Sequence, residues 1–475
     1  MSKRGMKMGL KSSTKLVLWC VLLTLIGAGP ANAQAAAKKM TAPELIQLTR
    51  AKDAPLEGAI RETFGEKELK EGTAWAGYGP DFFFALQAEA MPSLVIDDSP
   101  TGMAMEPVPV SKAGTAGAKL WYAAVRIDPV GKLHAFHYLV DGKPFGGRLD
   151  LPAYGPLSYV RPGVPQGRLS DKIAHVSKVY EGMKSNYWIY VPAEYDAKTP
   201  AALMVFQDGE GYAKRVEEPG AEHGILNVID NLIAEKKIPV MICVFINPGD
   251  ITDAPGTATY KGIKAHADRT GRTLPDATRS TLYDTVSDKY DTYLVGEILA
   301  DVGAQYNLRK DAYSRAITGL SSGGICSFNA AWQEPDQFSR VISWIGSFTA
   351  IQWRERPDVI DGGQDYPEKI RREAHRNIRV WLQDGSNDLE VPNWGSWPLA
   401  NLKMANALKG FGYDFHLSFG KGTHNASHGA AEFPEEMVWL WRGYDAAKTE
   451  ETYVMDPAEK ALPYFRVAVV NRSAE

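Results

Sequence analysis

Residues Arg315-Ala-Ile-Thr-Gly-Leu-Ser-Ser-Gly-Gly-Ile-Cys-Ser-Phe-Asn-Ala-Ala-Trp332 join a short apolar run, a glycine-rich turn and an amphipathic segment. Ala316-Ile-Thr318 predicts the end of a buried strand, and apolar residues recur at helical spacing after the turn. Between them, Gly319-Leu-Ser-Ser-Gly323 matches G-x-S-x-G. In this context the pattern indicates a nucleophile elbow, although an isolated match is more often a flexible turn. Ser321 is therefore the candidate nucleophile.

Two backbone amides are expected to hold the oxyanion that such a serine generates. One belongs to Ser322, because the helix predicted after the turn points its amino end at the site. The other should come from the loop after an earlier strand, where Gln207-Asp-Gly-Glu210 stands. We expect the amide of Glu210 to be this donor; the alternative is an ordinary Asp-Gly turn.

A serine hydroxyl needs a general base, which follows the serine in the doubly wound hydrolase order. The histidines after Ser321 are His375, His416, His424 and His428. His416 alternates with apolar residues in a predicted strand, and His375 lies in a charged helix, so both favour structural or surface roles. His424 lies in the loop after the last predicted strand, where catalytic residues of open α/β sheets belong. It is the candidate base.

Asp384 and Asp388 both follow a predicted strand and could orient the imidazole. We expect Asp388 to be the acid and Asp384 to form the turn beside Gly385, although both could be turn residues. The spacing of His424 and His428 would also suit a metal ion. No HExxH pattern or cysteine cluster accompanies them, so we expect no metal and no organic cofactor.

Beyond Gly167, strands and helices alternate, which predicts a doubly wound, mostly parallel sheet covered on both faces. The segment over residues 248–284 is too long for an ordinary connection and is expected to be a functional or partly mobile loop. Predicted strands cover residues 186–191, 201–207, 240–246, 316–318, 341–345, 378–382 and 415–419. Predicted helices cover residues 225–235, 287–306, 399–408 and 435–441.

Residues 1–33 have a basic start, an apolar stretch and the small residues Ala31-Asn-Ala33, as in a cleaved secretory signal peptide. We therefore expect a secreted or periplasmic protein without a stable membrane anchor. Five of the 53 basic residues lie in this leader, so the exported chain would have 48 basic and 57 acidic residues, a net charge of −9. Such a charge disfavours nucleic acid and anionic lipid as partners.

Short β-type runs between residues 73 and 147 predict a small all-β sandwich. The expected organisation is a lead-in and sandwich over 34–148, a proline-rich linker over 149–167, a catalytic domain over 168–447 and a polar tail over 448–475. Cys243 and Cys326 lie in apolar segments, which indicates packed thiols and not a disulfide.

The region from about Leu169 to Tyr444 resembles the esterase D/enterochelin esterase group of α/β-hydrolases, which includes feruloyl and acetylxylan esterases. The matching pieces are Met204-Val-Phe-Gln-Asp-Gly209, Val244-Phe-Ile-Asn-Pro-Gly249, Arg279-Ser-Thr-Leu-Tyr-Asp284, Thr318-Gly-Leu-Ser-Ser-Gly-Gly324, Asp384-Gly-Ser-Asn-Asp388 and Gly422-Thr-His-Asn425. The resemblance implies the same Ser321, His424 and Asp388 triad. It also implies that the sandwich looks like the immunoglobulin-like or starch-binding-like module of such esterases. Where Asp208-Gly209 stands, family members often have a histidine or a longer glycine run, and they often have a tryptophan near His428.

Together these features predict a secreted serine carboxylic-ester hydrolase acting on feruloyl or acetyl groups of plant polysaccharide. Trp353, Trp394 and Trp397 are candidates to stack on an aryl or sugar ring, with Arg279 and His428 as further substrate contacts; the tryptophans could equally be core residues. One alternative is a periplasmic siderophore esterase cutting a catecholate trilactone, for which the basic candidates are Arg279, Arg354 and Arg356. Another is a non-catalytic carbohydrate-binding protein on an esterase fold.

Overall fold

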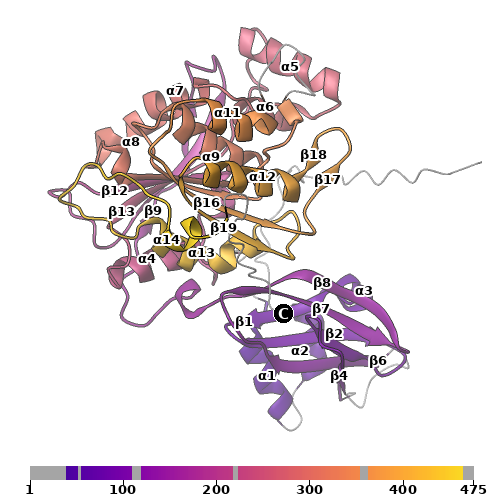
Figure 1. The fold of residues 1–475 in the computed structure, drawn as a ribbon. Coiled ribbons are helices and arrows are strands. Elements are labelled where there is room, and N and C mark those ends of the chain that lie inside the picture. The colour runs from indigo at the N-terminus through magenta and orange to yellow at the C-terminus, as the bar shows by residue number, and fades with distance from the viewer. Residues whose placement is uncertain (1–38, 52–54, 110–118, 218–222, 353–361, 464–475) are drawn as a thin grey trace, which may run out of the picture. The chain divides into compact units, whose positions relative to one another are not determined.

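The computed structural model describes residues 39–51, 55–109, 119–217, 223–352 and 362–463 (Figure 1). The predicted signal peptide and its cleavage site lie outside these residues. Within the described ranges, no helix is both long and apolar enough to span a bilayer.

A nine-stranded sheet forms the centre of the catalytic region, in the order β10-β11-β13-β12-β14-β15-β16-β19, with β9 paired to β11. The strands from β13 to β19 in this order are parallel, and β9, β10 and β11 run antiparallel. Every residue of β12 and β13 is buried, as expected for parallel strands covered on both faces. The bounds are β9 Arg168–Leu169, β10 Ile173–Val176, β11 Lys184–Val191, β12 Ala202–Gln207, β13 Met241–Ile246, β14 Arg315–Leu320, β15 Arg340–Trp344, β16 Arg379–Gly385 and β19 Asp414–Gly420.

Helices cover both faces of this sheet, so the predicted doubly wound arrangement is confirmed. One core contains residues of α5 to α9, α11 and α12, and the other contains residues of α4 and α13. Figure 1 shows α4 and α13 on the opposite side of the sheet from α9 and α12. The bounds are α4 Ile225–Ala234, α5 Ala258–Thr270, α6 Leu274–Tyr283, α7 Lys289–Tyr293, α8 Leu299–Gln305, α9 Ser322–Gln333, α11 Tyr366–Arg372, α12 Trp397–Gly410 and α13 Ser427–Leu440.

The loop predicted over residues 248–284 is wrong, because two helices, α5 and α6, occupy most of it. The hydroxyls of Thr257 and Thr273 cap their first turns by accepting amide hydrogen bonds. Gly271 ends α5 with a φ of 73°. The start predicted for the last helix is also wrong: α13 begins at Ser427, and Pro434 lies inside it.

The N-terminal region contains two four-stranded antiparallel sheets, in the orders β1-β2-β6-β5 and β4-β3-β7-β8. An apolar core of side chains from both sheets lies between them. Asp141 and Gly142, with φ of 51° and 73°, form the predicted hairpin turn between β7 and β8. The bounds are β1 Ala74–Tyr78, β2 Asp81–Ala88, β3 Ser93–Ile96, β4 Met103–Ala104, β5 Glu106–Pro107, β6 Lys119–Arg126, β7 Lys132–Val140 and β8 Lys143–Ala153.

Three helices in the lead-in before the sandwich pack against its first sheet through Leu45, Ile60 and Leu69. They are α1 Ala42–Arg50, α2 Leu56–Thr63 and α3 Glu66–Glu71. The linker predicted to begin at residue 149 is also wrong at its start, because β8 continues to Ala153 with its last residues buried. Cys243 and Cys326 are buried free thiols, as predicted.

The tail predicted after residue 447 contributes to packing at the amino end of the sheet. The ring of Tyr453 is buried and lies over the guanidinium groups of Arg340 and Arg379, at 5.2 and 4.5 Å. Arg340 is fully buried, donates to the carbonyls of Tyr313 and Leu440, and is also covered by the rings of Trp441 and Tyr444. Aromatic faces therefore compensate part of the cost of burying this cation.

Candidate active site

Ser321 lies on the sharp turn between β14 and α9, with φ 59° and ψ −118°. This backbone region costs a non-glycine residue about 1–3 kcal/mol and is found at sites that need it. The flanking glycines allow the turn to close: a Cβ on Gly319 would lie 2.5 Å from the carbonyl oxygen of Gly323. The amide of Ser321 donates to the carbonyl of Trp344 at 2.9 Å, which fixes the turn to the neighbouring strand. The geometry is that of a nucleophile elbow.

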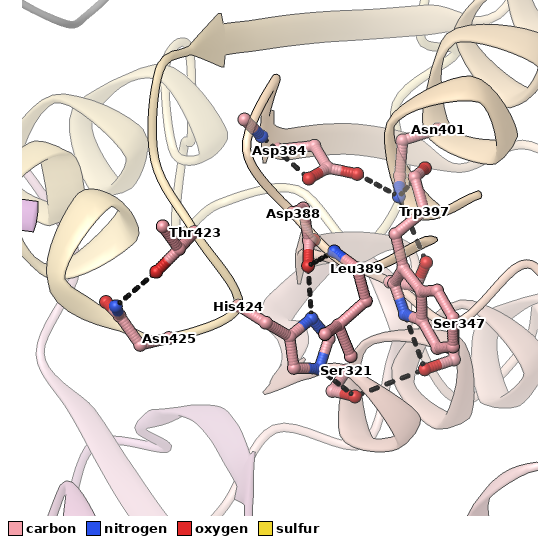
Figure 2. A network of polar contacts seen from close by, with 12 residues as sticks. Ser321, Ser347, Asp384, Asp388, Leu389, Trp397, Asn401, Thr423, His424 and Asn425 are labelled. Carbon is pink, nitrogen blue, oxygen red and sulfur yellow. Dashed lines mark hydrogen bonds and ion pairs between the residues drawn. The ribbon is translucent and has the colours of Figure 1, made fainter. Parts of the chain in front are cut away.

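The predicted serine, histidine and aspartate form one hydrogen-bonded chain (Figure 2). Nε2 of His424 lies 2.8 Å from Oγ of Ser321, and Nδ1 lies 2.5 Å from Oδ1 of Asp388. The carboxylate of Asp388 is buried, whereas the imidazole of His424 is 19% exposed. Because a carboxylate only accepts, Nδ1 carries the proton, and Nε2 is free to accept the proton of the serine hydroxyl.

Parallel pairing explains how distant segments meet at this place. The three residues follow β14, β16 and β19, and β15 is the one strand between β14 and β16 in the order of the sheet. The carboxyl ends of parallel strands lie at one edge, so the loops after them converge there. The loop carrying His424 is further held by Thr423. Its amide and hydroxyl donate to the carboxylate of Asp150 in β8, the amide at 2.8 Å.

Asp384, the alternative acid, does not contact His424. Its side chain is completely buried and accepts hydrogen bonds from the amide of Gly385 at 2.7 Å and from Nδ2 of Asn401 at 2.6 Å. Burial, and next the negative charge of Asp388, raise the pKa of Asp384 well above its ordinary value. Both effects favour the protonated form of the Asp384 carboxyl group.

A second hydroxyl, which sequence reasoning missed, lies against the nucleophile. Oγ of Ser347 is 3.2 Å from Oγ of Ser321 and accepts a hydrogen bond from the indole Nε1 of Trp397 at 3.1 Å. Trp397 is only 2% exposed, and its ring lies edge-on to the imidazole of His424 with ring centroids 5.6 Å apart. The stacking role predicted for Trp397 is therefore wrong, because its ring faces are packed inside the protein.

The substrate contact predicted for His428 is also wrong. His428 lies on α13 and is 1% exposed. Its Nδ1 accepts from the amide of Gln383 at 3.0 Å, and its Nε2 donates to Glu432 at 3.1 Å. Glu432 in turn accepts from Ser418 at 2.6 Å. These hydrogen bonds lie in the interior of the protein, beneath the loops that carry the catalytic residues.

In the described part of the chain, no three His, Cys, Asp or Glu side chains gather as metal ligands do.

The Glu210 amide is already bonded within the protein. It donates to Oδ1 of Asn247 at 3.0 Å, and Nδ2 of Asn247 returns a bond to the Glu210 carboxylate at 2.9 Å. The oxyanion role predicted for Glu210 is therefore wrong. The amide of Ser322 is the first of α9, and no acceptor among the described residues contacts it. It remains available to a ligand at the helix amino end.

Arg279, predicted to contact substrate, forms its hydrogen bonds with groups of the protein next to the nucleophile elbow. Its guanidinium holds the carboxylate of Asp208 in two hydrogen bonds, at 3.0 and 2.7 Å, and reaches the carbonyl of Leu320 at 3.4 Å. Asp208 follows β12 with φ 54°. Arg279 thus ties the loop after β12 to the elbow, while 30% of its side chain stays exposed.

Of the two other tryptophans predicted to contact substrate, the structure describes only Trp394. Trp394 is half-buried in the hairpin of β17 Glu390–Val391 and β18 Gly395–Ser396, with the guanidinium of Arg272 5.2 Å from its ring centroid. Its ring lies 6.5 Å from that of Trp397. Trp353, together with Arg354 and Arg356, lies outside the described residues.

The doubly wound sheet and the strained serine turn at its carboxyl edge define the α/β-hydrolase class. Residues 180–440 match the sequence model of the family described as Putative esterase, which covers more than half of the chain. The chain belongs to this family, and its class of activity is carboxylic ester hydrolysis. The resemblance inferred from the sequence motifs is thereby confirmed.

Several solved structures are similar to this chain at low sequence identity. Enterochelin esterase from Shigella flexneri is 16% identical, with 79% of this chain and 97% of that chain covered and a TM-score of 0.47. Ferric enterobactin esterase from Salmonella typhimurium is 14% identical over 78% and 96% of the two chains, with a TM-score of 0.46. A ferulic acid esterase from Anaeromyces mucronatus is 16% identical over 62% and 96%, with a TM-score of 0.42.

Proposed function

We propose that this protein hydrolyses carboxylic esters through an acyl-enzyme formed on Ser321. The observation that carries this proposal is the continuous chain from Ser321 through His424 to Asp388, with contacts of 2.8 and 2.5 Å. An unactivated serine is a weak nucleophile, and a base at hydrogen-bond distance removes that obstacle. The strained elbow presents the hydroxyl at the sheet edge, where a substrate carbonyl can approach.

In acylation, Oγ of Ser321 attacks the ester carbonyl carbon while its proton moves to Nε2 of His424. Asp388 stabilises the imidazolium that forms and keeps its orientation. The carbonyl oxygen becomes an oxyanion, which the amide of Ser322 and the positive end of the α9 dipole stabilise. The intermediate collapses as the bond to the alcohol oxygen breaks, and Nε2 returns the proton to the departing alcohol.

Deacylation repeats these steps with water as the nucleophile. Water attacks the acyl carbon and gives a proton to Nε2 of His424. The bond from the acyl carbon to Oγ of Ser321 then breaks, the carboxylic acid leaves, and the proton passes from Nε2 to Oγ. This restores the free enzyme without a metal or an organic cofactor.

For the substrate, we propose feruloyl or acetyl esters of plant polysaccharide met outside the cytoplasm. The leader-like residues 1–33 support export, and the N-terminal double sheet supports a separate substrate-binding module. Trp394 supports an aryl or sugar ring at the edge of the site, because it is half-buried and neighbours Trp397 beside His424. The net charge argues against nucleic acid and membrane surfaces as partners.

A catecholate trilactone is the second candidate substrate. The observation that favours it is the presence of two cations at this edge, Arg272 over Trp394 and the partly exposed Arg279. Cationic and aromatic groups together would suit anionic catechol rings.

The test is to treat the chain from Gln34 onward, and its Ser321→Ala variant, with a fluorophosphonate probe. Labelling is expected in the parent and absent in the variant, because only an activated serine reacts. Hydrolysis of p-nitrophenyl acetate, methyl ferulate and a catecholate lactone would then rank the substrates. Equal labelling of both proteins would refute the role of Ser321. Absence of both labelling and turnover in the parent would favour a non-catalytic carbohydrate-binding protein.

A further inference from the structure

Ser347 is joined to the nucleophile through both main chain and side chain. It lies in the loop after β15 and is 1% exposed. Its amide donates to the carbonyl of Ser321 at 3.1 Å, and its hydroxyl oxygen lies 3.2 Å from Oγ of Ser321. Figure 2 shows the two hydroxyls side by side, with the indole of Trp397 above Ser347. The triad mechanism proposed above does not require this second serine.

The direction of each hydrogen bond follows from the donors available. Nε1 of Trp397 can only donate, so it occupies a lone pair of the Ser347 oxygen. Nδ1 of His424 donates to Asp388, so Nε2 accepts the hydroxyl proton of Ser321. With that proton directed to the imidazole, the contact between the serines is left for the proton of Ser347. The order is Trp397 to Ser347 to Ser321 to His424.

We propose, on the basis of the function proposed above, that Ser347 is a catalytic residue that promotes release of Ser321 from the acyl-enzyme. Its hydroxyl donates to Oγ of Ser321 in the free enzyme. When Oγ is acylated, its lone pair is shared with the ester carbonyl, so it accepts a hydrogen bond poorly. The bond is weakened as the acyl-enzyme forms and regained as the bond from the acyl carbon to Oγ breaks.

This change in bond strength gives the two half-reactions different sensitivities. In acylation, the hydrogen bond from Ser347 helps to hold Oγ of Ser321 in place for attack. This benefit is offset because the same hydrogen bond weakens as Oγ becomes acylated. In deacylation, the bond forms as Oγ departs with the proton from Nε2 of His424, so it stabilises that transition state more than the acyl-enzyme. Removal of the Ser347 hydroxyl should therefore slow deacylation more than acylation.

The experiment is stopped-flow hydrolysis of p-nitrophenyl acetate by the parent and by Ser347→Ala. The deacylation rate is expected to fall about three- to tenfold, as for the loss of one ordinary hydrogen bond. Because deacylation limits turnover of an activated ester, kcat and KM should fall together, with kcat/KM changed by less than about twofold. The burst of p-nitrophenol should approach the enzyme concentration.

Ser343→Ala is the matched control, because Ser343 is a fully buried serine of β15 whose hydroxyl has no partner among the described residues. It should leave the burst and the deacylation rate unchanged. Ser347→Cys keeps the side-chain volume but is a weaker donor, so it should shift the rates in the same direction by less. It provides the measurement if Ser347→Ala does not fold.

An unchanged deacylation rate in an active enzyme would overturn the proposal for Ser347. So would a fall in kcat/KM with a raised KM and an unchanged kcat, which would indicate that the loss of Ser347 impairs acylation instead. Failure of the parent to label or to turn over ester would instead refute the underlying esterase function, so the two failures are distinct.

Discussion

The carboxyl group of Asp384 is completely buried near Asp388, and it accepts hydrogen bonds from the backbone amide of Gly385 and the side-chain amide of Asn401. Burial, and next the negative charge of Asp388, raise the pKa of Asp384, so the folded protein keeps this proton to a higher pH than the unfolded chain, which releases it near pH 4. A carboxyl group with a raised pKa contributes a stabilisation of the folded state that is fully present below the unfolded pKa of about 4. This stabilisation is lost progressively as pH rises through the folded pKa.

We therefore expect Asp384→Asn to become more stable relative to the parent as pH rises from about 4 to 7. The difference should grow by up to about 1.4 kcal/mol per pH unit while the folded group stays protonated. The amide is neutral and can still accept from Asn401, so kcat should stay within about threefold. Urea unfolding at several pH values, with kcat at each, provides the measurement.

Asp384→Ala is the companion variant, because it removes the acceptor of both amides. It should be about 1–3 kcal/mol less stable than Asp384→Asn at every pH, because neither variant has a group that titrates at this position. A stability difference between Asp384→Asn and the parent that stays constant from pH 4 to 7 would contradict a protonated Asp384.

The elbow depends on two glycines that cross at close range between β14 and α9. A methyl group on Gly319 would lie 2.5 Å from the Gly323 carbonyl oxygen and 2.9 Å from Cβ of Gln207. We predict that Gly319→Ala destabilises the protein by about 1–3 kcal/mol or more, because the backbone must shift to accept the methyl group. Fluorophosphonate labelling of Ser321 should fall at least tenfold, since attack depends on its position.

Gly303→Ala in α8 serves as the control, because its added methyl group would meet nothing within 4 Å. It should stabilise the protein by up to about 1 kcal/mol, as alanine does in helices, and leave labelling unchanged. Normal labelling of Gly319→Ala would show that the elbow tolerates the displacement.

Helices and strands with a strong apolar pattern were predicted well. Those whose ends depend on polar capping groups were not. The strands β12 and β13 are almost entirely apolar and buried along their length, and this pattern was enough to predict them. In contrast, α5 presents few buried residues, and its start depends on the hydroxyl of Thr257. The start of α13 at Ser427 was also missed, because the helix continues through Pro434 and proline is usually excluded from helix interiors.

Across the molecule, the loop of the catalytic histidine is held by a residue far away in the sequence. Asp150 in β8 accepts hydrogen bonds from both the amide and the hydroxyl of Thr423, next to His424. We predict that Asp150→Ala lowers kcat about tenfold with little change in KM, because the imidazole loses its fixed position. Steady-state kinetics with p-nitrophenyl acetate provides the measurement.

Lys421→Ala is the comparison, since Lys421 lies in the same loop and forms an exposed ion pair with Asp98. Exposed ion pairs contribute little, so its kcat should stay within about twofold. Equal effects of Asp150→Ala and Lys421→Ala would mean that Asp150 does not position the histidine.

The candidate site shows what sequence alone can supply at this scale. Ser321, Asp388 and His424 were predicted because parallel pairing brings strand ends together wherever they lie in the chain. Ser347 had no such signal, since it belongs to no motif and its partner Trp397 lies fifty residues away. The amide of Glu210 was assigned wrongly because its occupation depends on the side chain of Asn247, which comes from another strand's loop.

Arg340 sets a practical limit on where this chain can be cut. The family match stops at residue 440, yet Trp441, Tyr444 and Tyr453 beyond it cover the guanidinium group. A chain shortened to the matched region would lack these aromatic rings. Its apolar surface around the guanidinium group of Arg340 would then be exposed to water. Recombinant expression that respects the homology boundary alone should therefore yield insoluble or unstable protein, whereas extension past Tyr453 should rescue it.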